Sequence, residues 1–404
     1  MRLGLPVAVC VFQLVFLTAV VDLMVTHREM GDFGKFYYAA RGFLEGRDLY
    51  QSTVATFAPA SEVEYFDLNP PHFHLVILPL AALPARAALA VWAALGLLAF
   101  AWSLRLIVGA TRLTLPARRW LDLAAVLLAF PGVVATVTFG QVSWVLLVPV
   151  TLAWLAVREN RWTRAGWWLG VAVAFKPFLA VFLPYLAAKR QTRACAAALL
   201  VASFSLVAGI AAFGLESYRS WVATLGRMNW AFSIWNGSLL GLLTRIFDGS
   251  GRFQPIVHMP ALVMPLWMIG AGVVLFVTFA VALRGACPVD RACALLLVGS
   301  LLASPLGWIY YLVLALGPIA ALAGPWLPAR EVPKVSRPGV LLLAWAGLGC
   351  MWPPQLLRIA PRHAWATASF ASAYFWGMLG LWLALLIVRA RPDAQQAAQE
   401  EPSA

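Results

Sequence analysis

The residues best suited to chemistry lie in one polar stretch, residues 27–69, between two apolar segments. Eight of the 17 Asp and Glu residues of the chain fall from Asp22 to Asp67, and aromatic residues are interleaved with them. Aromatic rings suit the flat faces of sugars and lipid chains. A carboxylate beside such rings can act as a general base that takes a proton from an acceptor hydroxyl. The stretch therefore predicts a loop that presents carboxylates to a substrate.

Within this loop, the spacing of apolar residues predicts a helix from Asp32 to Glu45, with Gly46 as its C-cap. The apolar positions that recur at helical spacing are Phe33, Phe36, Tyr37, Ala40 and Leu44. We expect this helix to lie flat at a membrane interface, with its rings at the level of the lipid headgroups.

The other acidic residues of the stretch have different expected roles, which depend on the residues around them. Asp67 stands beside Asn69-Pro70-Pro71, where the chain re-enters an apolar segment, and is a second candidate for substrate binding. Glu62 and Glu64 are expected to be solvated. Asp22 lies near the outer end of the first apolar segment, where an acid is either functional or simply solvated at the interface.

Cations elsewhere in the chain could bind a phosphate. Lys176 interrupts an apolar run next to Pro177, and we expect Lys176 and Arg245 to contact a donor phosphate. Snorkelling towards the headgroups is the alternative for Arg227 and Arg245. Sugar transfer from a lipid phosphate requires such a set of parts: a base, cations on the leaving phosphate, and a lipid groove.

The sequence indicates a metal only weakly and no other cofactor. His72 and His74 are two residues apart, but the chain has no His-Glu-x-x-His pattern. The five cysteines fit no metal-binding spacing, so they are interpreted as small apolar residues.

Composition places these residues in a membrane protein. The chain is 62% hydrophobic and 12% charged, whereas soluble domains carry about 25% charged residues. Apolar windows long enough to span a bilayer recur from end to end. The net charge of +13 comes from short basic clusters between apolar segments, which is typical of cytoplasmic loops rather than of nucleic-acid binding.

The apolar windows predict an all-α polytopic protein of about 11 membrane segments. We expect one transmembrane domain over residues 1–389, with periplasmic loops at 27–69 and 215–255 and a disordered cytoplasmic tail at 390–404. Residues 71–83 are too short to span and are expected to be re-entrant. The expected segments are residues 5–26 (an uncleaved first helix), 85–108, two spans in 120–157 hinged at 138–141, a hairpin over 165–187 broken at Pro177, and 195–214, 257–283, 292–303, 305–323, 339–352 and 366–388.

This topology brings the polar residues of distant segments to one side of the membrane. Besides the acidic loop, that side receives Gln141, Lys176, Asn236 and Arg245, together with the segment from Ser304 to Tyr311. Convergence on one face predicts a site there. The Arg-rich loops occupy the opposite side, so the site is expected to face the periplasm of a bacterial inner membrane.

Six short motifs in this order resemble the bacterial membrane glycosyltransferases of family 87, the polyprenol-phosphate-mannose-dependent type, which belong to the GT-C superfamily. The resemblance covers roughly residues 27–325. The motifs are Gly31-Asp32-Phe33 with Gly46-Arg47-Asp48-Leu49-Tyr50, then Asn69-Pro70-Pro71, Gly140-Gln141 with Trp144, Gly166 through Lys176-Pro177, Asn236-Gly237-Ser238-Leu239 with Arg245, and Ser304-Pro305 with Trp308.

The resemblance implies a GT-C fold and an enzyme that transfers a hexose from a polyprenyl-phosphate sugar to a lipid or glycan acceptor. Mannose is the expected hexose, and the transfer is expected to invert the configuration at the anomeric carbon. Asp32 matches the acidic residue of the first outer loop, which serves as general base. Lys176 and Arg245 match positions assigned to the donor phosphate. The further residues expected at the substrate are Asp67, Gln141, Asn236, Trp308, Tyr310 and Tyr311.

The chain departs from the family pattern at two places. It has Asn69 where Tyr is common before the two prolines, and Tyr310 and Tyr311 where a His is common after the Trp. Two other functions are therefore kept as alternatives: a transporter or flippase for a lipid or polyol, and a non-catalytic subunit of an envelope assembly complex.

Overall fold

The computed structural model describes residues 31–50, 67–111, 130–228, 230–249, 253–285, 287–323 and 363–387, with isolated positions at 11–12, 14–15, 17–18, 22, 124 and 127. This part of the chain is helical and contains no strand beyond an isolated bridge that pairs Asn236 with Trp308. The α-helices are α2 Gly31–Leu44, α3 Leu78–Ala81, α4 Ala85–Thr111, α6 Pro131–Phe139, α7 Ser143–Arg158, α8 Trp162–Phe175, α9 Phe182–Ala188, α10 Thr192–Gly226, α11 Leu239–Leu243, α12 Val263–Ala282, α13 Val289–Ala303, α14 Leu316–Ala323, α17 Ala364–Ala368 and α18 Ala373–Ile387. The short 3-10 or π-helical turns are η1 Pro71–Leu75, η2 Pro177–Val181, η3 Thr244–Asp248, η4 Pro260–Leu262, η5 Ile309–Ala315 and η7 Phe370–Ser372.

Four helical stretches of the described chain are long and apolar enough to cross a membrane: Ala85–Thr111, Thr192–Gly226, Pro260–Ala282 and Ala364–Ile387. Their outer faces carry exposed apolar side chains, such as Phe204 and Phe276, each 73% exposed. Apolar surface of this kind is stable against lipid but not against water. The protein is therefore an all-α, multi-pass membrane protein. The count of about 11 segments stays a prediction, because the segment at 339–352 and most of 5–26 lie outside the described residues.

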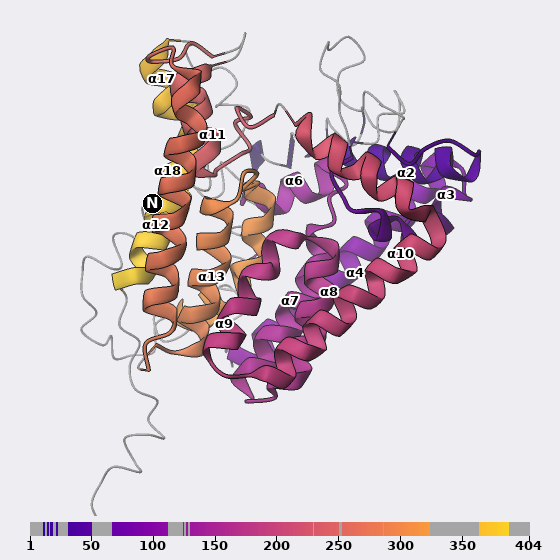
Figure 1. Cartoon of the computed structure of the whole chain (residues 1–404), viewed down its shortest axis with the longest axis horizontal. Coiled ribbons are helices and arrows are strands. Elements are labelled where there is room, and N and C mark those ends of the chain that lie inside the picture. Colours follow the sequence, from indigo (N-terminus) through magenta and orange to yellow (C-terminus); the bar gives the residue numbers. More distant parts are fainter. Residues whose placement is uncertain are drawn as a thin grey trace, which may run out of the picture.

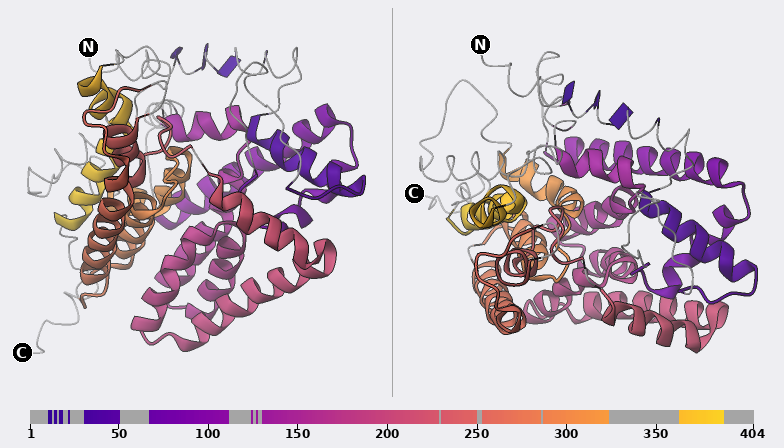
Figure 2. Two further views of the ribbon diagram at one scale, coloured as in Figure 1. Left: turned by 45° about the horizontal axis from the view of Figure 1, so that its top comes forward. Right: turned by 90° about the horizontal axis from the view of Figure 1, so that it is seen from above.

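Helix α2, which carries Asp32, lies with three short helices at one end of the molecule (Figure 1). α2, α3, α6 and α11 lie towards the top of that view, whereas the α7–α8 and α9–α10 turns lie at the bottom. Figure 2 shows a second separation, across the bundle, between the indigo α2–α3 region on one side and the yellow α18 on the other. The α7–α8 and α9–α10 turns thus lie at the other end of the molecule from α2, and the expectation that the α2 end faces the periplasm stays a prediction.

Two of the predicted helix breaks are confirmed. α6 ends at Gly140, whose φ of 61° is left-handed, and α7 begins three residues later. α8 ends at Lys176, which has an extended backbone (φ −141°, ψ 100°), and Pro177 starts η2. Proline lacks the amide needed to continue α8, so the helix ends there with Lys176 at the break.

The stretch 215–255, which was predicted to be a loop, begins with helix, because α10 continues through its first 12 residues. α10 is 35 residues long and continues to Gly226 across a kink at Gly214 (φ 74°, ψ 163°). At 1.5 Å per residue it is roughly 50 Å long, which exceeds the roughly 30 Å of a bilayer core. Only the 192–213 portion is needed for a crossing, and the remainder continues as a helix beyond it.

The predicted helix of the first loop is present as α2, but its apolar face packs against protein. Phe33 is fully buried and stacks on Trp92, with ring centroids 5.4 Å apart. Phe36 packs edge-on against Phe73 at 5.1 Å. Leu44, at the end of the helix, is 53% exposed. α2 is therefore held by the bundle through these rings, and its expected location at a membrane interface stays a prediction.

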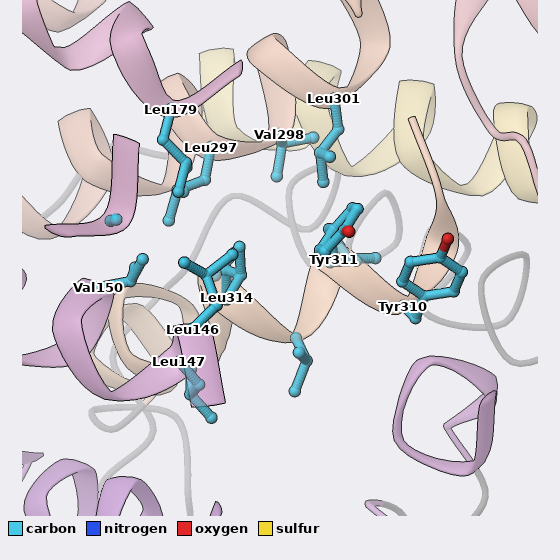
Figure 3. Close-up of a cluster of buried hydrophobic side chains, with 14 of the residues drawn as sticks. Leu146, Leu147, Val150, Leu179, Leu297, Val298, Leu301, Tyr310, Tyr311 and Leu314 are labelled. Carbon is cyan, nitrogen blue, oxygen red and sulfur yellow. The ribbon is translucent and has the colours of Figure 1, made fainter. Parts of the chain in front are cut away.

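A leucine-rich core lies directly under the polar end of the molecule. Figure 3 shows Leu146 and Leu147 of α7, Leu179 of η2 and Leu297 and Leu301 of α13 around Tyr311 of η5. Truncating a buried Leu to Ala costs about 2–5 kcal/mol. This core therefore fixes η5, and with it the two tyrosines, against the bundle.

Candidate active site

Asp32 lies in the first turn of α2 at the centre of a polar cluster. Its carboxylate accepts a hydrogen bond from Gln141 Nε2, and its Oδ1 is 2.5 Å from Lys35 Nζ, one helical turn away. The Asp32 and Lys35 side chains are 18% and 11% exposed, respectively. Lys35 also lies over the ring of Trp230, 4.9 Å from its centroid. Asp32 is thus shielded and oriented, yet retains some access to solvent.

Two glycines allow α2 and α6 to approach closely enough for this contact. Gly31 has φ 57°, and a Cβ there would lie 2.8 Å from the backbone oxygen of Phe139. A Cβ on Gly140 would lie 2.7 Å from that of Phe33. The indole of Trp92 donates to the Gly140 oxygen at 2.8 Å and closes the junction. The backbone itself therefore brings Asp32 against Gln141.

Gly31→Ala is expected to destabilise the protein and to move Asp32 away from Gln141. The left-handed φ costs about 1–2 kcal/mol for a residue with a Cβ, and the clash with Phe139 adds to this. Gly46→Ala is the matched control, because Gly46 has φ 80° but no neighbour near its Cβ. Melting temperatures in detergent should fall more for Gly31→Ala, and transferase activity should fall only there. Equal effects of both substitutions would show that the close approach is unimportant.

Lys176 belongs to a second, more buried chain of polar contacts. Lys176 Nζ donates to Asn69 Oδ1 at 2.5 Å, and Asn69 Nδ2 donates to Asp67 Oδ1 at 2.7 Å. The other oxygen of Asp67 accepts from His74 Nε2 at 2.8 Å. Tyr50 donates to the Asn69 backbone oxygen at 2.5 Å. Both oxygens of Asp67 are thus engaged by protein groups, and Asp67 stands behind Asn69 rather than beside Asp32.

The charges of these two clusters influence one another. Removal from water lowers the pKa of Lys176 to about 8, although the negative charges of Asp67 and Asp32 act in the opposite direction. Burial alone would raise the pKa of Asp67, but the pairing with His74, the Asn69 amide and the charge of Lys176 together lower it. Asp67 is therefore a stable anion, whereas Lys176 titrates close to neutral pH.

Aromatic rings border both clusters. Tyr310 lies with its hydroxyl 3.2 Å from Gln141 Nε2 and stacks on Trp308, with centroids 5.9 Å apart and planes at 15°. The ring of Tyr311 lies 5.3 Å from Lys176 Nζ. Figure 3 shows the two tyrosines side by side at the edge of the leucine core. The structure thus brings Asp32, Gln141, Lys176 and this aromatic pair together.

Asn236 and Arg245 hold the loop that follows α10. Asn236 Nδ2 donates to the backbone oxygens of Ala231 and Pro305 at 3.0 Å, and its Oδ1 accepts from two backbone amides. The fully buried Arg245 donates to Ser372 Oγ at 2.9 Å and to three carbonyls of residues 232–236. Both side chains are engaged in positioning Trp235 and Trp308, and neither lies in the Asp32 or Lys176 cluster.

Sequence reasoning missed three members of the site: Lys35, His74, and Asn69, which was noted only as part of a family motif. Lys35 stands three residues after Asp32 in a helix, which is a spacing at which opposite charges meet. The sequence pattern could therefore have predicted this ion pair. His74 stands seven residues after Asp67 across two prolines. Because no regular element relates those two positions, their contact depends on the fold.

These features define a class of protein: an all-α membrane protein with a carboxylate and a lysine beside aromatic rings at one end of the bundle. The sequence profile of glycosyltransferase family 87 matches residues 68–305. The match covers more than half of the chain, so the protein belongs to this family and is a glycosyltransferase.

Two curated relatives are similar over most of their length. One is a polyprenol-phosphate-mannose-dependent alpha-(1-2)-phosphatidylinositol mannoside mannosyltransferase of Mycobacterium tuberculosis, 27% identical over 90% of this chain and 86% of the relative. A protein of the same description from Mycolicibacterium smegmatis is 28% identical, over 94% of this chain and 88% of the relative. No solved structure gives a significant match.

Proposed function

We propose that this protein transfers mannose from a polyprenyl-phosphate donor to a lipid or glycan acceptor at the periplasmic face of the inner membrane, with inversion. The observation that carries the proposal is a continuous set of contacts from Asp32 to Lys176. Gln141 donates to Asp32 and lies 3.2 Å from the Tyr310 hydroxyl. Tyr310 packs on Tyr311 with ring centroids 4.8 Å apart, and the Tyr311 ring lies 5.3 Å from Lys176 Nζ. The names of both relatives specify a polyprenol-phosphate-mannose donor and a phosphatidylinositol mannoside acceptor. A mannosylated lipid is therefore the first acceptor to test.

In the proposed reaction, Asp32 takes the proton of an acceptor hydroxyl as the hydroxyl oxygen attacks the anomeric carbon. The bond from that carbon to the phosphate oxygen breaks on the opposite side, and its electron pair leaves with the polyprenyl phosphate. Lys176 neutralises this developing charge. Gln141 holds the Asp32 carboxylate, and Lys35 must release it when the acceptor binds.

Asp67, Asn69 and His74 act as positioning residues for Lys176 in this proposal. Asn69 Oδ1 accepts from the lysine, and Asp67 fixes the Asn69 amide so that its oxygen points towards Lys176. The buried carboxylate also favours the charged form of Lys176. Trp308, Tyr310 and Tyr311 provide flat surfaces for the sugar or the prenyl chain.

The direct test incubates purified protein with a panel of polyprenyl-phosphate sugars and lipid acceptors, and identifies the products by mass spectrometry. We expect a single hexose to be added when mannose is the donor sugar. Sugar movement across proteoliposomes without any transfer product would instead support a transporter. Donor binding without turnover over the whole panel would support a non-catalytic subunit.

Donor affinity should depend on pH through Lys176. Because its pKa is lowered to about 8, the lysine is charged below this pH and neutral above it. The donor phosphodiester stays anionic throughout, so its KM is expected to rise, about tenfold per pH unit at most, as pH increases past about 8. Steady-state kinetics from pH 6 to 10 check this. A donor KM that stays constant over that range would exclude Lys176 as the phosphate ligand.

A further inference from the structure

A basic cavity lies at the end of the molecule away from Asp32. It measures about 480 Å³ and is lined by the α7–α8 and α9–α10 turns, residues 160–164 and 190–193. Four arginines contribute to the lining: Arg161, Arg164, Arg190 and Arg193. All four are exposed, and the acidic side chain paired with this group is Glu159, 3.3 Å from Arg161. The cavity therefore carries a strong positive charge.

The two turns that form the cavity are built alike. Each contains the pattern Arg-x-Thr-Arg, at residues 161–164 and 190–193. Each passes through a left-handed residue, Asn160 or Arg190, both with φ 56°. The same pair of backbone hydrogen bonds closes both turns. In the first turn, Asn160 N–H donates to the Val157 oxygen and Arg161 N–H to the Ala156 oxygen, at 3.0 and 2.8 Å. In the second, Arg190 N–H donates to the Ala187 oxygen and Gln191 N–H to the Leu186 oxygen, at 2.8 and 2.9 Å. The backbone equivalence pairs Asn160 with Arg190 and Arg161 with Gln191, one residue out of register with the sequence pattern. The two turns therefore share their backbone geometry, and their arginines occupy different positions in it.

Each turn ends in a helix N-terminus that opens onto the cavity. The first amides bonded within the two helices are those of Ala165 and Cys195, which donate to Arg161 and Gln191 at 3.0 Å. The three amides before each have no partner within their helix. Neither cap residue, Arg161 nor Gln191, bonds them with its side chain within the described structure. Free amides and the positive end of the helix dipole favour a phosphate group at such a place.

Close packing of α8 and α10 holds the two N-termini together. A Cβ on Gly166 would lie 2.2 Å from the Ala194 oxygen, and one on Gly170 would lie 2.7 Å from the Ala198 oxygen. The two backbones are therefore nearly in contact one turn above the cavity. Both sets of amides and all four arginines can then face one ligand.

Lipid-facing surface begins directly beside the cavity. Leu199, Leu200 and Phe204 of α10 are 53, 58 and 73% exposed, and they follow Arg193 within three turns. Trp167 of α8 is 47% exposed on the neighbouring helix. A ligand with a phosphate headgroup and acyl chains could place the phosphate in the cavity and its chains on this surface. A soluble phosphate would use only the cavity.

We propose that this cavity binds the phosphate headgroup of an anionic phospholipid, in the leaflet opposite to the proposed active site. The arginine excess places this end on the cytoplasmic side, where anionic headgroups attract basic clusters. The bound lipid joins the α7–α8 turn to the α9–α10 turn. It thereby braces the hairpin that carries Lys176 at its other end.

The test is a lipid titration of the full chain in neutral detergent, read by native mass spectrometry. Wild-type protein should bind phosphatidylglycerol at least tenfold more tightly than phosphatidylcholine. Arg164→Gln with Arg193→Gln should weaken phosphatidylglycerol binding about 25-fold, since each basic residue near the surface contributes about fivefold. Arg47→Gln with Arg219→Gln removes the same charge from exposed arginines outside the cavity, and should change binding less than about twofold.

A further variant guards against misfolding. Arg190→Gly removes one cavity cation while relieving the left-handed backbone, so the fold should be retained, and binding should weaken about fivefold. Equal losses in the two double variants, or equal binding of both lipids, would overturn the site. If millimolar inorganic phosphate completely displaces phosphatidylglycerol from the protein, the ligand of the cavity is a free anion, and the assignment to a lipid is overturned.

Discussion

Asp32→Asn is expected to lower the rate of mannosyl transfer by about 10²–10⁴-fold, the usual contribution of a positioned general base. Asparagine keeps the shape of the side chain and can still contact Gln141, but it cannot take the proton of the acceptor hydroxyl. The variant should therefore bind donor with nearly unchanged affinity and fail in turnover. Single-turnover transfer with radiolabelled donor, alongside a donor-binding titration, measures both quantities.

Two controls separate base catalysis from loss of an ion pair. Lys35→Met removes the partner 2.5 Å from Asp32 but leaves the carboxylate. Since partly exposed pairs contribute about 0–1 kcal/mol, this variant should lose less than about fivefold in rate. Glu45→Gln removes an exposed carboxylate at the other end of α2 and should retain full activity. If Asp32→Asn transfers mannose at the wild-type rate while remaining inserted, another group is the base.

Lys176→Met is the second substitution with a large expected effect, and it should act on the donor. A hydrogen bond to a charged group contributes about 1.5–3 kcal/mol, which corresponds to about 10- to 150-fold in kcat/KM for the polyprenyl-phosphate donor. Methionine fills a similar volume beside Tyr311 without a charge. The KM for the acceptor should change little, because the acceptor hydroxyl is expected at Asp32. Initial rates with each substrate varied in turn separate the two parameters.

Lys189→Met is the matched control for this substitution. Lys189 lies at the other end of the same hairpin, after α9, where its ammonium is 6.0 Å from the Tyr185 ring. It carries the same charge at the end away from Asp32, so its loss should leave donor kinetics within about twofold of wild type. A rise of the acceptor KM alone in Lys176→Met would move Lys176 from the donor to the acceptor.

Much of the architecture follows from local patterns. Apolar windows fix which segments are helical and long, and Pro177 and Gly140 mark breaks because proline removes an amide and glycine alone adopts φ > 0 easily. The helix predicted from Asp32 to Glu45 is observed as α2, Gly31–Leu44, and its burial pattern through Phe33, Phe36 and Tyr37 follows from the 3.6-residue period. The family motifs are likewise short and contiguous, and the profile match over residues 68–305 agrees with them.

Periodicity did not say what the apolar face of α2 would contact. A face of Phe and Tyr suits a membrane interface and a protein core equally well, and the choice depends on partners such as Trp92 and Phe73, which come from other segments. The same holds for α10, where residues after Gly214 were polar enough to suggest a loop but continue as helix. Local composition does not predict the contacts of a segment when the free energy of folding depends on side chains from other segments.

The acidic stretch from residue 27 onward made Asp32 the candidate base, through its residue type, its place at a helix start and its match to the family motif. Composition alone indicated a multi-pass membrane protein. The roles of the remaining polar residues depended on tertiary contacts. Asp67 is buried behind Asn69, and Asn236 and Arg245 are engaged by backbone groups. Gln141 and Lys176 come near Asp32. Gln141 and Lys176 have hydrogen-bond partners 109 and 107 residues away in the chain, and Asn236 has one 69 residues away, so only the packed bundle determines these contacts.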